Sequence, residues 1–254
     1  FVMGVTPRRG HVTDGTAATD FDPEEIERKI SIQTSVASGD WANNRINLID
    51  TPGYANFVGE ALSALRAADA AIEVVDAVAG PEVQTHRLFH AAEDMDLPRV
   101  FVVNRMDREN ASYERALENV QAAFGRAAVP VALPVGEGKA FRGIVDLVSG
   151  KAQVYGDDAS GKFQLTDAPA AQQEAVNSWR EKLVEMVAES NEDLMEEFFE
   201  KGTLPQAEIV RGLRLGVLAH QRPGPLRLGQ DPVLVVRVEV GVVEGREVLG
   251  DGKR

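Results

Sequence analysis

Asp50-Thr-Pro-Gly53 combines a potential metal ligand with a potential phosphate-binding backbone, since it follows an apolar strand and precedes an amphipathic helix. A carboxylate at the end of a strand can lie beside Mg²⁺, and a glycine lets its own N–H approach a terminal phosphate. Asp-x-x-Gly is also a common turn, but its place between a strand and a helix is the context that a phosphate sensor requires. The segment, with Thr51 and Pro52 in its loop, predicts a nucleotide-dependent switch.

A second polar segment, Asn104-Arg-Met-Asp107, ends the apolar strand expected at residues 100–103. A carboxylate here can accept two hydrogen bonds from N1 and N2 of guanine, a pair of donors that adenine lacks. Asn104 can contact the other edge of the purine, and the guanidinium of Arg105 can stack on the base. The alternative is a helix N-cap, because Asn and Asp both favour that position. Together with Asp50–Gly53, the segment favours a guanine-nucleotide switch that includes Met106.

Two other segments could suggest ligand sites, and we interpret neither in that way. Gly10 and Gly15 have the spacing of a phosphate-binding P-loop, but its lysine is absent, no strand precedes them and no amphipathic helix follows. The acidic residues between positions 20 and 27 lack the glycine and the terminal glutamate of a calcium hand, and we expect a mobile acidic loop there.

The elements that must position the polar segments alternate along the first half of the chain. We expect strands at residues 30–36, 45–49, 71–76 and 100–103, with a turn at 40–44 and helices at 57–68, 85–94 and 113–124. This order predicts an α/β fold with a doubly wound, mainly parallel sheet, in which ligands bind at the carboxyl ends of the strands.

The second half has a different character from Pro134 onward. Short strands are expected at residues 143–147, 151–155 and 163–165. Helices are expected to begin near residues 167–169, after Asn191, and at Thr203, which forms a capping box with Gln206 and has Pro205 just inside the helix. We therefore divide the chain into a nucleotide-binding part at 1–133, an α+β insertion at 134–220, and a linker with a β-rich tail at 221–254. Residues 232–243 either add to the main sheet or begin another domain, since two such strands cannot form a stable domain alone.

The composition narrows the class of protein. Of 254 residues, 44% are hydrophobic and 26% are charged, and no apolar run approaches the roughly 20 residues that span a bilayer. The net charge of −13 opposes nonspecific attraction to nucleic acid, so we expect no DNA binding and only local contacts with RNA. The absence of cysteine fits a reducing cytosol.

Taken in order, these segments resemble the GTP-binding domain of elongation factor G, a translational GTPase. Residues 20–32 resemble its first switch, Asp50–Gly53 its second switch, and Asn104–Asp107 its guanine-specificity motif. The insertion of that family is similar to residues 141–147, 151–155 and 183–198. The resemblance covers roughly residues 8 to 220 and implies a P-loop NTPase-like fold.

The resemblance also implies ligands, partners and roles. GTP or GDP would bind with Mg²⁺, with Ser31 and Asp50 in the metal shell, Gly53 N–H at the γ-phosphate, and Asn104, Arg105 and Asp107 at the guanine. The implied partner is the ribosome, through large-subunit RNA and factor-binding proteins. Translocation during elongation in the cytoplasm is the implied process.

The chain departs from the family pattern in several places. The family's first-switch threonine matches Ser31, and residues 221–254 match the family poorly. The family's P-loop and its first strand are expected just before residue 1, so the beginning looks truncated. A Ser-Ala-Leu/Lys loop expected soon after Val217 is not found. The hydrolytic histidine of the family matches Tyr54, and a phenol with a reference pKa near 10 cannot take over the protonation role of an imidazole. This argues against fast hydrolysis.

Two alternatives follow from these departures. One is a nonhydrolytic ribosome-binding protein, or docking module, which the substitution at Tyr54 and the absent P-loop favour. Tyr54 also resembles elongation factor G paralogues whose loop reads Pro-Gly-Tyr, which implies a specialised second copy. The other is a switch specific for ATP or another nucleotide, against which Asp107 argues.

Overall fold

The computed structural model describes residues 6–7, 10–41, 43–125, 128–156, 162–219 and 233–236. These residues fall into two compact units, the first ending at Ala61 and the second beginning at Leu62. Among the described residues, no helix has both the length and the apolar character needed to cross a membrane.

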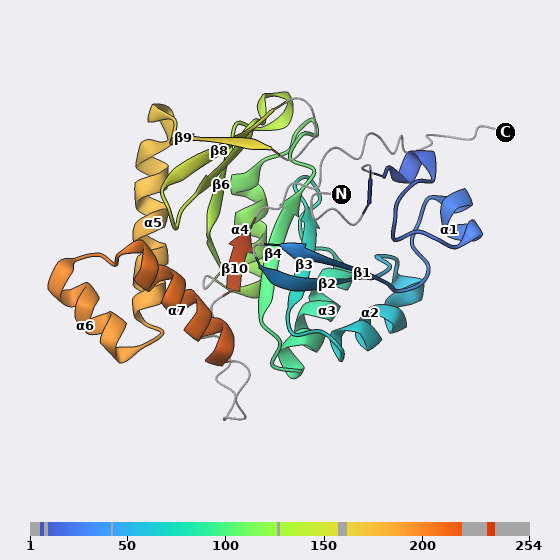
Figure 1. Ribbon diagram of the computed structural model, residues 1–254, viewed down its shortest axis with the longest axis horizontal. Coiled ribbons are helices and arrows are strands. Elements are labelled where there is room, and N and C mark those ends of the chain that lie inside the picture. The colour runs from blue at the N-terminus through green and yellow to red at the C-terminus, as the bar shows by residue number, and fades with distance from the viewer. Residues whose placement is uncertain are drawn as a thin grey trace. The chain divides into compact units, whose positions relative to one another are not determined.

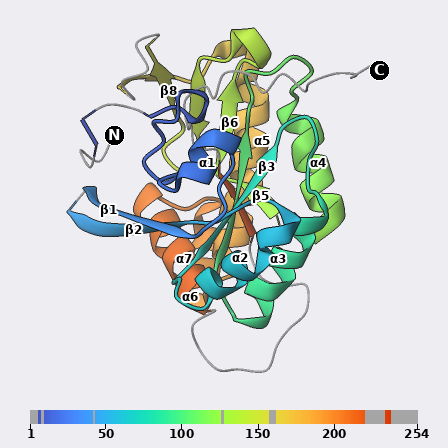
Figure 2. The ribbon, with the colours of Figure 1, turned by 90° about the vertical axis from the view of Figure 1, so that its right-hand side faces the viewer.

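The first unit is built around a two-stranded antiparallel ribbon (Figure 2). Its strands are β1 (Ser35–Trp41) and β2 (Asn44–Asp50), with Ser35 opposite Asp50 at one end. The other elements are η1 (Val12–Asp14), α1 (Pro23–Arg28), η2 (Ala55–Phe57) and the start of α2 (Val58–Leu65). The first strand was predicted at residues 30–36, which is wrong by about five residues. The N–H groups of Ile32 and Gln33 bond to a carboxylate instead of a partner strand.

The second unit contains a parallel sheet in the order β3-β4-β10-β5 (Figure 1). Its elements are β3 (Ala71–Asp76), α3 (Val83–Asp94), β4 (Arg99–Asn104), α4 (Tyr113–Phe124), β5 (Ala128–Pro130) and β10 (Val233–Val236). The α/β fold with a mainly parallel sheet is therefore confirmed. Of the Val-rich tail, residues 233–236 add to this main sheet, and the rest of that stretch lies outside the described residues.

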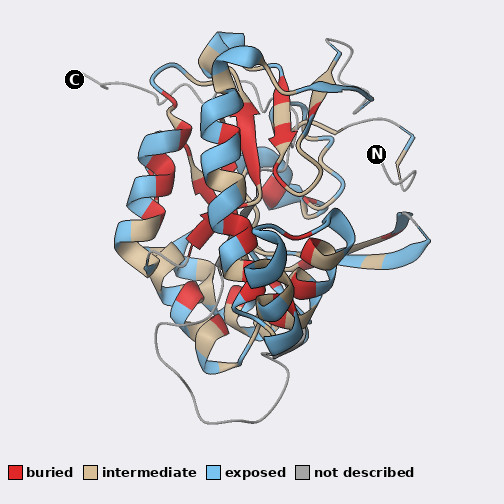
Figure 3. Cartoon of the chain, turned by 90° about the vertical axis from the view of Figure 1, so that its left-hand side faces the viewer, coloured by how far each residue is buried: buried red, intermediate tan, exposed pale blue. Residues whose placement is uncertain are grey.

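One face of the parallel sheet carries the core of the second unit. Residues of β3 alternate between buried and exposed. Figure 3 draws the buried residues in red. Phe89 of α3, Phe101 of β4 and Phe124 of α4 form one aromatic cluster, with ring centroids 4.2 to 5.7 Å apart. Burial also raises the pKa of Glu73 to about 7, although the charge of Arg99 opposes the shift. The apolar face thus holds β3 and β4 in one register.

A second, antiparallel sheet has the order β6-β7-β8-β9. Its strands are β6 (Ala132–Val135), β7 (Gly143–Asp146), β8 (Lys151–Tyr155) and β9 (Phe163–Asp167). The remaining elements are η3 (Gly138–Ala140), η4 (Ala170–Gln172), α5 (Gln173–Ala188), α6 (Glu192–Lys201) and α7 (Gln206–Ala219). Strands β5 and β6 were not predicted, because Pro130 and Pro134 interrupt the run. Pro134 is tolerated because β6 is an edge strand.

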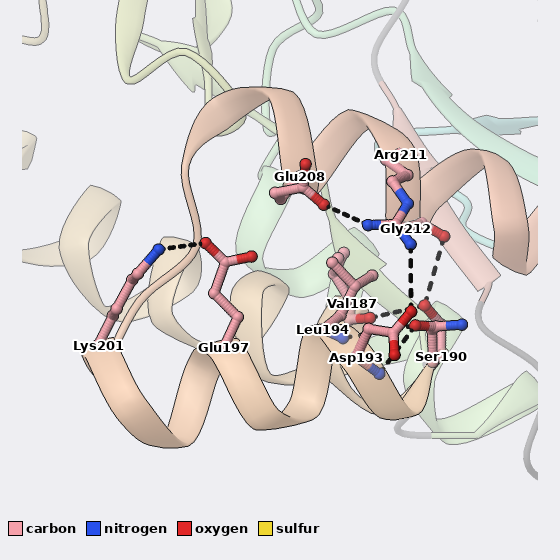
Figure 4. Close-up of polar contacts among 10 residues, drawn as sticks. Val187, Ser190, Asp193, Leu194, Glu197, Lys201, Glu208, Arg211 and Gly212 are labelled. Atoms are coloured by element: carbon pink, nitrogen blue, oxygen red, sulfur yellow. Dashed lines mark hydrogen bonds and ion pairs between the residues drawn. The ribbon is translucent and has the colours of Figure 1, made fainter.

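The helices α5, α6 and α7 meet at Gly212 (Figure 4). A Cβ atom at this position would lie against Val187 Cγ1 and 2.8 Å from Leu194 Cδ1. The hydroxyl of Ser190 donates a hydrogen bond to the carbonyl of Val187 (2.7 Å), and its oxygen lies 3.5 Å from the carbonyl oxygen of Gly212. Glycine is therefore required here by close approach of the helices rather than by backbone conformation.

Replacing Gly212 with Ala should destabilise the protein. Overpacking costs about 1–3 kcal/mol, which exceeds the gain of about 1 kcal/mol in helix propensity. We expect the free energy of unfolding, measured in urea, to fall by about 1 kcal/mol. The control is Gly59→Ala in α2, where a Cβ meets no atom within 4 Å. That change should leave stability unaltered or raise it by about 0.5 kcal/mol, and equal effects of the two changes would contradict the packing argument.

Candidate functional site

Asn104 and Asp76 end two neighbouring parallel strands and stand opposite each other in the register. The chain then turns sharply, since Arg105 has a φ of 60°, in the left-handed region. The side-chain oxygen of Asn104 accepts a hydrogen bond from Arg105 N–H (2.8 Å) and supports that turn. Non-glycine residues rarely adopt this conformation, so the turn depends on bonds of this kind.

The four residues of the predicted guanine-binding segment have different surroundings. The carboxylate of Asp107 is exposed, and Asn104 and Arg105 are half-buried. Met106 is only 1% exposed and belongs to the core, and its carbonyl accepts a hydrogen bond from Gly138 N–H (2.8 Å). Met106 therefore anchors the segment, while Asp107 projects into solvent where a base can reach it.

Asp76 is a site residue that the sequence analysis missed. One carboxylate oxygen accepts hydrogen bonds from the backbone N–H of Val78 (2.8 Å) and Ala79 (3.1 Å). The other lies 3.0 Å from Arg105 Nη1 and 3.4 Å from Arg108 Nη1. Because Asp76 ends the strand expected at residues 71–76, the rule that placed Asn104 at the ligand-binding edge could also have identified it.

Asp76, Arg105 and Arg108 line a pocket of about 360 Å³ at the carboxyl end of β3. Burial of the Asp76 carboxyl acts to raise its pKa. The hydrogen bonds from Ala79, Val78 and Arg105, together with the charge of Arg108, outweigh burial and hold the pKa below its usual value. Asp76 is consequently an anion that balances the two cations Arg105 and Arg108.

The predicted first switch is organised around Glu25, which is fully buried. One of its oxygens accepts hydrogen bonds from the N–H groups of Phe21 (3.1 Å) and Asp22 (3.0 Å). The other accepts from Ile32 (2.8 Å) and Gln33 (2.9 Å). The expected mobile acidic loop is thus wrong at residues 23–28, which form helix α1 with a capping box between Asp22 and Glu25. The carboxylate of Glu25 thus holds together the two ends of the segment from Phe21 to Gln33.

Ser31 and Asp50, the predicted metal ligands, both belong to the first unit. The Ser31 hydroxyl donates its hydrogen to Asp20 (2.7 Å), which leaves its oxygen lone pairs available. Asp50 is exposed and stands opposite Ser35 in the β1–β2 ribbon. The buried hydroxyl of Ser35 has no hydrogen-bond partner in the described structure. These hard oxygen donors fit Mg²⁺ in kind.

The metal site at Ser31 and Asp50 stays a prediction. Within the described ranges, no group of three or more His, Asp or Glu side chains is arranged to hold a metal ion. Mg²⁺ characteristically keeps several waters and binds through one or two protein oxygens together with substrate phosphates. Two oxygen donors of this kind would match that pattern if a phosphate ligand were bound beside them.

The Asp50–Gly53 loop exposes its glycine and the tyrosine that follows. Thr51 is half-buried, Pro52 is buried, and a Cβ at Gly53 would meet no atom within 4 Å. Tyr54 is 49% exposed and precedes η2 with extended backbone. Asp50 to Tyr54 lie in the first unit and Asn104 to Asp107 in the second, so their convergence on one ligand stays a prediction.

The chain matches a family model, and its fold is similar to solved structures. Residues 1–211 match the family model of the elongation factor Tu GTP binding domain. The fold is similar to the crystal structure of a protein from Thermus thermophilus, with a TM-score of 0.80 and 31% sequence identity. That match covers 92% of this chain and 33% of the other, so this chain spans about a third of the length of its relative.

Replacing Glu25 with Gln should open the segment between Phe21 and Gln33. An amide nitrogen cannot accept a hydrogen bond, so two of the four N–H groups lose their acceptor, at about 1–3 kcal/mol for each unsatisfied group. We expect amide hydrogen exchange in residues 21–33 to be at least about tenfold faster. Glu24→Gln is the control, because Glu24 makes only an exposed ion pair with Arg28 (3.4 Å).

The same contact predicts a pH dependence. Burial acts to raise the pKa of Glu25, but hydrogen bonds from Gln33, Ile32, Asp22 and Phe21 lower it below 4.5. Stabilisation by a carboxyl with a depressed pKa is complete above the unfolded value and is lost as the pH falls through the folded value. Protection of the segment should therefore fall in acid below about pH 4.5. Glu25→Gln should remove this dependence, and an identical acid profile would contradict the assignment.

Proposed function

This chain belongs to the elongation factor Tu GTP binding domain family, the GTP-binding domain of translational GTPases, and from that premise we propose a guanine-nucleotide switch of the elongation factor G type. The observation that carries the proposal is the edge of the parallel sheet in the second unit. There Asn104 ends β4, Met106 is fixed in the core and Asp107 is exposed. Such an edge is where α/β folds bind ligands.

In this proposal, Asp107 accepts hydrogen bonds from N1 and N2 of guanine, and Asn104 contacts the other edge of the base. Arg105 covers the base, and Gly53 N–H binds the γ-phosphate. Ser31 and Asp50 hold Mg²⁺, which when bound neutralises charge on the β- and γ-phosphates. Loss of the γ-phosphate releases the Asp50–Gly53 loop and the segment closed by Glu25, which gives two states of the domain.

We further propose that the ribosome is the partner, through large-subunit RNA and factor-binding proteins, and that the process is translocation in the cytoplasm. The net charge of −13 supports local rather than extended contacts with RNA. We also propose the predicted division into a nucleotide-binding part at residues 1–133 and an elongation factor G-type insertion at 134–220. The α+β character of residues 132–219 supports that division.

A second candidate function is a nonhydrolytic ribosome-binding module. Tyr54 favours it, because this side chain occupies the position of the family's catalytic histidine and is half exposed. In that case nucleotide binding would set the shape of the domain, and hydrolysis would not be needed for docking.

Exchange of Asp107 tests the guanine assignment. GDP should raise the melting temperature of the full-length parent, and Asp107→Asn should weaken GDP binding about 100-fold, since two hydrogen bonds to a charged acceptor are lost. Xanthosine diphosphate, which carries a carbonyl in place of the guanine amino group, should then bind better than GDP. Asp69→Asn, an exposed carboxylate before β3, serves as the control. A parent that GDP does not stabilise would overturn the proposed function.

Exchange of Tyr54 separates the two candidate functions. An imidazole can position and activate water near neutral pH, whereas a phenol cannot do so through the same protonation states. We expect Tyr54→His to raise ribosome-stimulated phosphate release from GTP by at least about tenfold. Tyr54→Phe should leave the parent rate unchanged. Absence of ribosome stimulation in the parent and in both variants would favour the docking module.

A further inference from the structure

Met106 and Asp107 lie between two arginines that bond to the same carboxylate. Arg105 lies on one side of Met106 and Asp107 and Arg108 on the other, and both guanidinium groups reach the same oxygen of Asp76. The carboxylate side chain is 18% exposed, and those of the arginines are 39% and 38% exposed. These ion pairs are thus better shielded from water than surface pairs, most of which contribute little.

The two oxygens of Asp76 serve different parts of the molecule. Oδ1 accepts the N–H groups of Val78 and Ala79 and so forms the turn that follows β3. Oδ2 accepts from Arg105 and Arg108, which follow β4. The backbone adds one further bond between the same two loops, from Ala77 N–H to the carbonyl of Asn104 (2.9 Å). A side chain with a single acceptor oxygen would cap the turn after β3 equally well. The turn alone therefore does not account for the second oxygen, Oδ2, which bonds to the two arginines.

We propose that Asp76 is a positioning residue for guanine recognition, which holds Arg105 and Arg108 so that the backbone between them presents Asp107 to the base. The proposal rests on the guanine-nucleotide function above and adds to it a residue outside Asn104–Asp107. The strained φ of Arg105 makes such support necessary, since the turn is not favoured by the residue itself.

The choice of arginine at position 105 has a physical reason in this arrangement. A guanidinium donates from its edge and keeps both planar faces available for stacking, which an ammonium group cannot do. The bond to Asp76 uses an edge N–H, so it fixes the plane of Arg105 before the base arrives. Fewer side-chain rotamers are then lost on binding.

The test compares GDP with inosine diphosphate, which lacks the amino group that Asp107 accepts. Dissociation constants are measured by calorimetry on the full-length protein, its Asp76→Asn, Arg105→Gln and Arg108→Gln variants, and the double variant Asp76→Asn/Arg105→Gln. Asn at position 76 keeps an oxygen for Val78 and Ala79 and removes the charge that holds the arginines. Asp167→Asn is the matched control, because Asp167 pairs with Lys151 (2.7 Å) on the exposed strand β9 of the second sheet.

We expect Asp76→Asn to weaken GDP binding about tenfold and to reduce the preference for GDP over inosine diphosphate. In the Arg105→Gln background, the same change should have a smaller effect than in the parent, because only the contact with Arg108 remains to be lost. A purely structural role would lower the melting temperature and leave the preference unchanged. The control should match the parent in both affinity and preference.

Two other outcomes are informative. If Asp76→Asn does not fold, Arg105→Gln and Arg108→Gln test the same contact from partly exposed positions, and each should reduce the preference. An unaltered preference in every folded variant, with a parent that still prefers GDP, would overturn the role of Asp76 and leave the guanine function intact. A parent without preference for GDP would overturn both.

Discussion

The parallel pairing of β3 with β4 is the constraint on which the candidate site depends. Parallel strands end at the same edge, so the register that places Asp76 opposite Asn104 also brings a carboxylate from one loop to two guanidinium groups in the next. A shift of one residue would turn each of these side chains to the other face of the sheet. The aromatic cluster of Phe89, Phe101 and Phe124 opposes such a shift, so it helps to keep Asp76 opposite Asn104.

Both units use a carboxylate to order backbone that makes no regular ladder. Glu25 closes the segment from Phe21 to Gln33 with four backbone hydrogen bonds, and Asp76 joins the loop after β3 to the loop after β4. In each case hydrogen bonds to the charged form outweigh burial and lower the pKa. Such loops can adopt a second conformation when a ligand competes for the same groups, whereas a packed strand cannot do so easily.

Much of the fold followed from the sequence, because periodicity and chain order determine parallel βα units. The strands at residues 71–76 and 99–104 and the helix at 113–124 agree closely with their patterns. The failures have local causes. Glu25 reads as one acid among several, and only the tertiary structure shows that it takes hydrogen bonds from residues seven and eight positions ahead. Strands β5 and β6 could not be predicted because Pro130 and Pro134 disfavour strands in general. Both strands are short, and they tolerate proline at a strand end and at a sheet edge. Asp76 ends a predicted strand, but its neighbours in the sequence do not indicate the two arginines that bond to it. These arginines follow 29 and 32 residues later.

The position of β10 explains how the chain accommodates residues 131–232 without disturbing the site. Strand β10 lies between β4 and β5, so the segment that contains the second sheet and the helices α5 to α7 leaves and re-enters the parallel sheet at adjacent strands. The entropy of closing a loop rises only slowly with its length, and a folded insertion with neighbouring ends adds little to that cost. Strand β4, which delivers Asn104, is consequently hydrogen-bonded on both sides. Asn104 therefore ends an internal strand, where fraying is opposed from both neighbours.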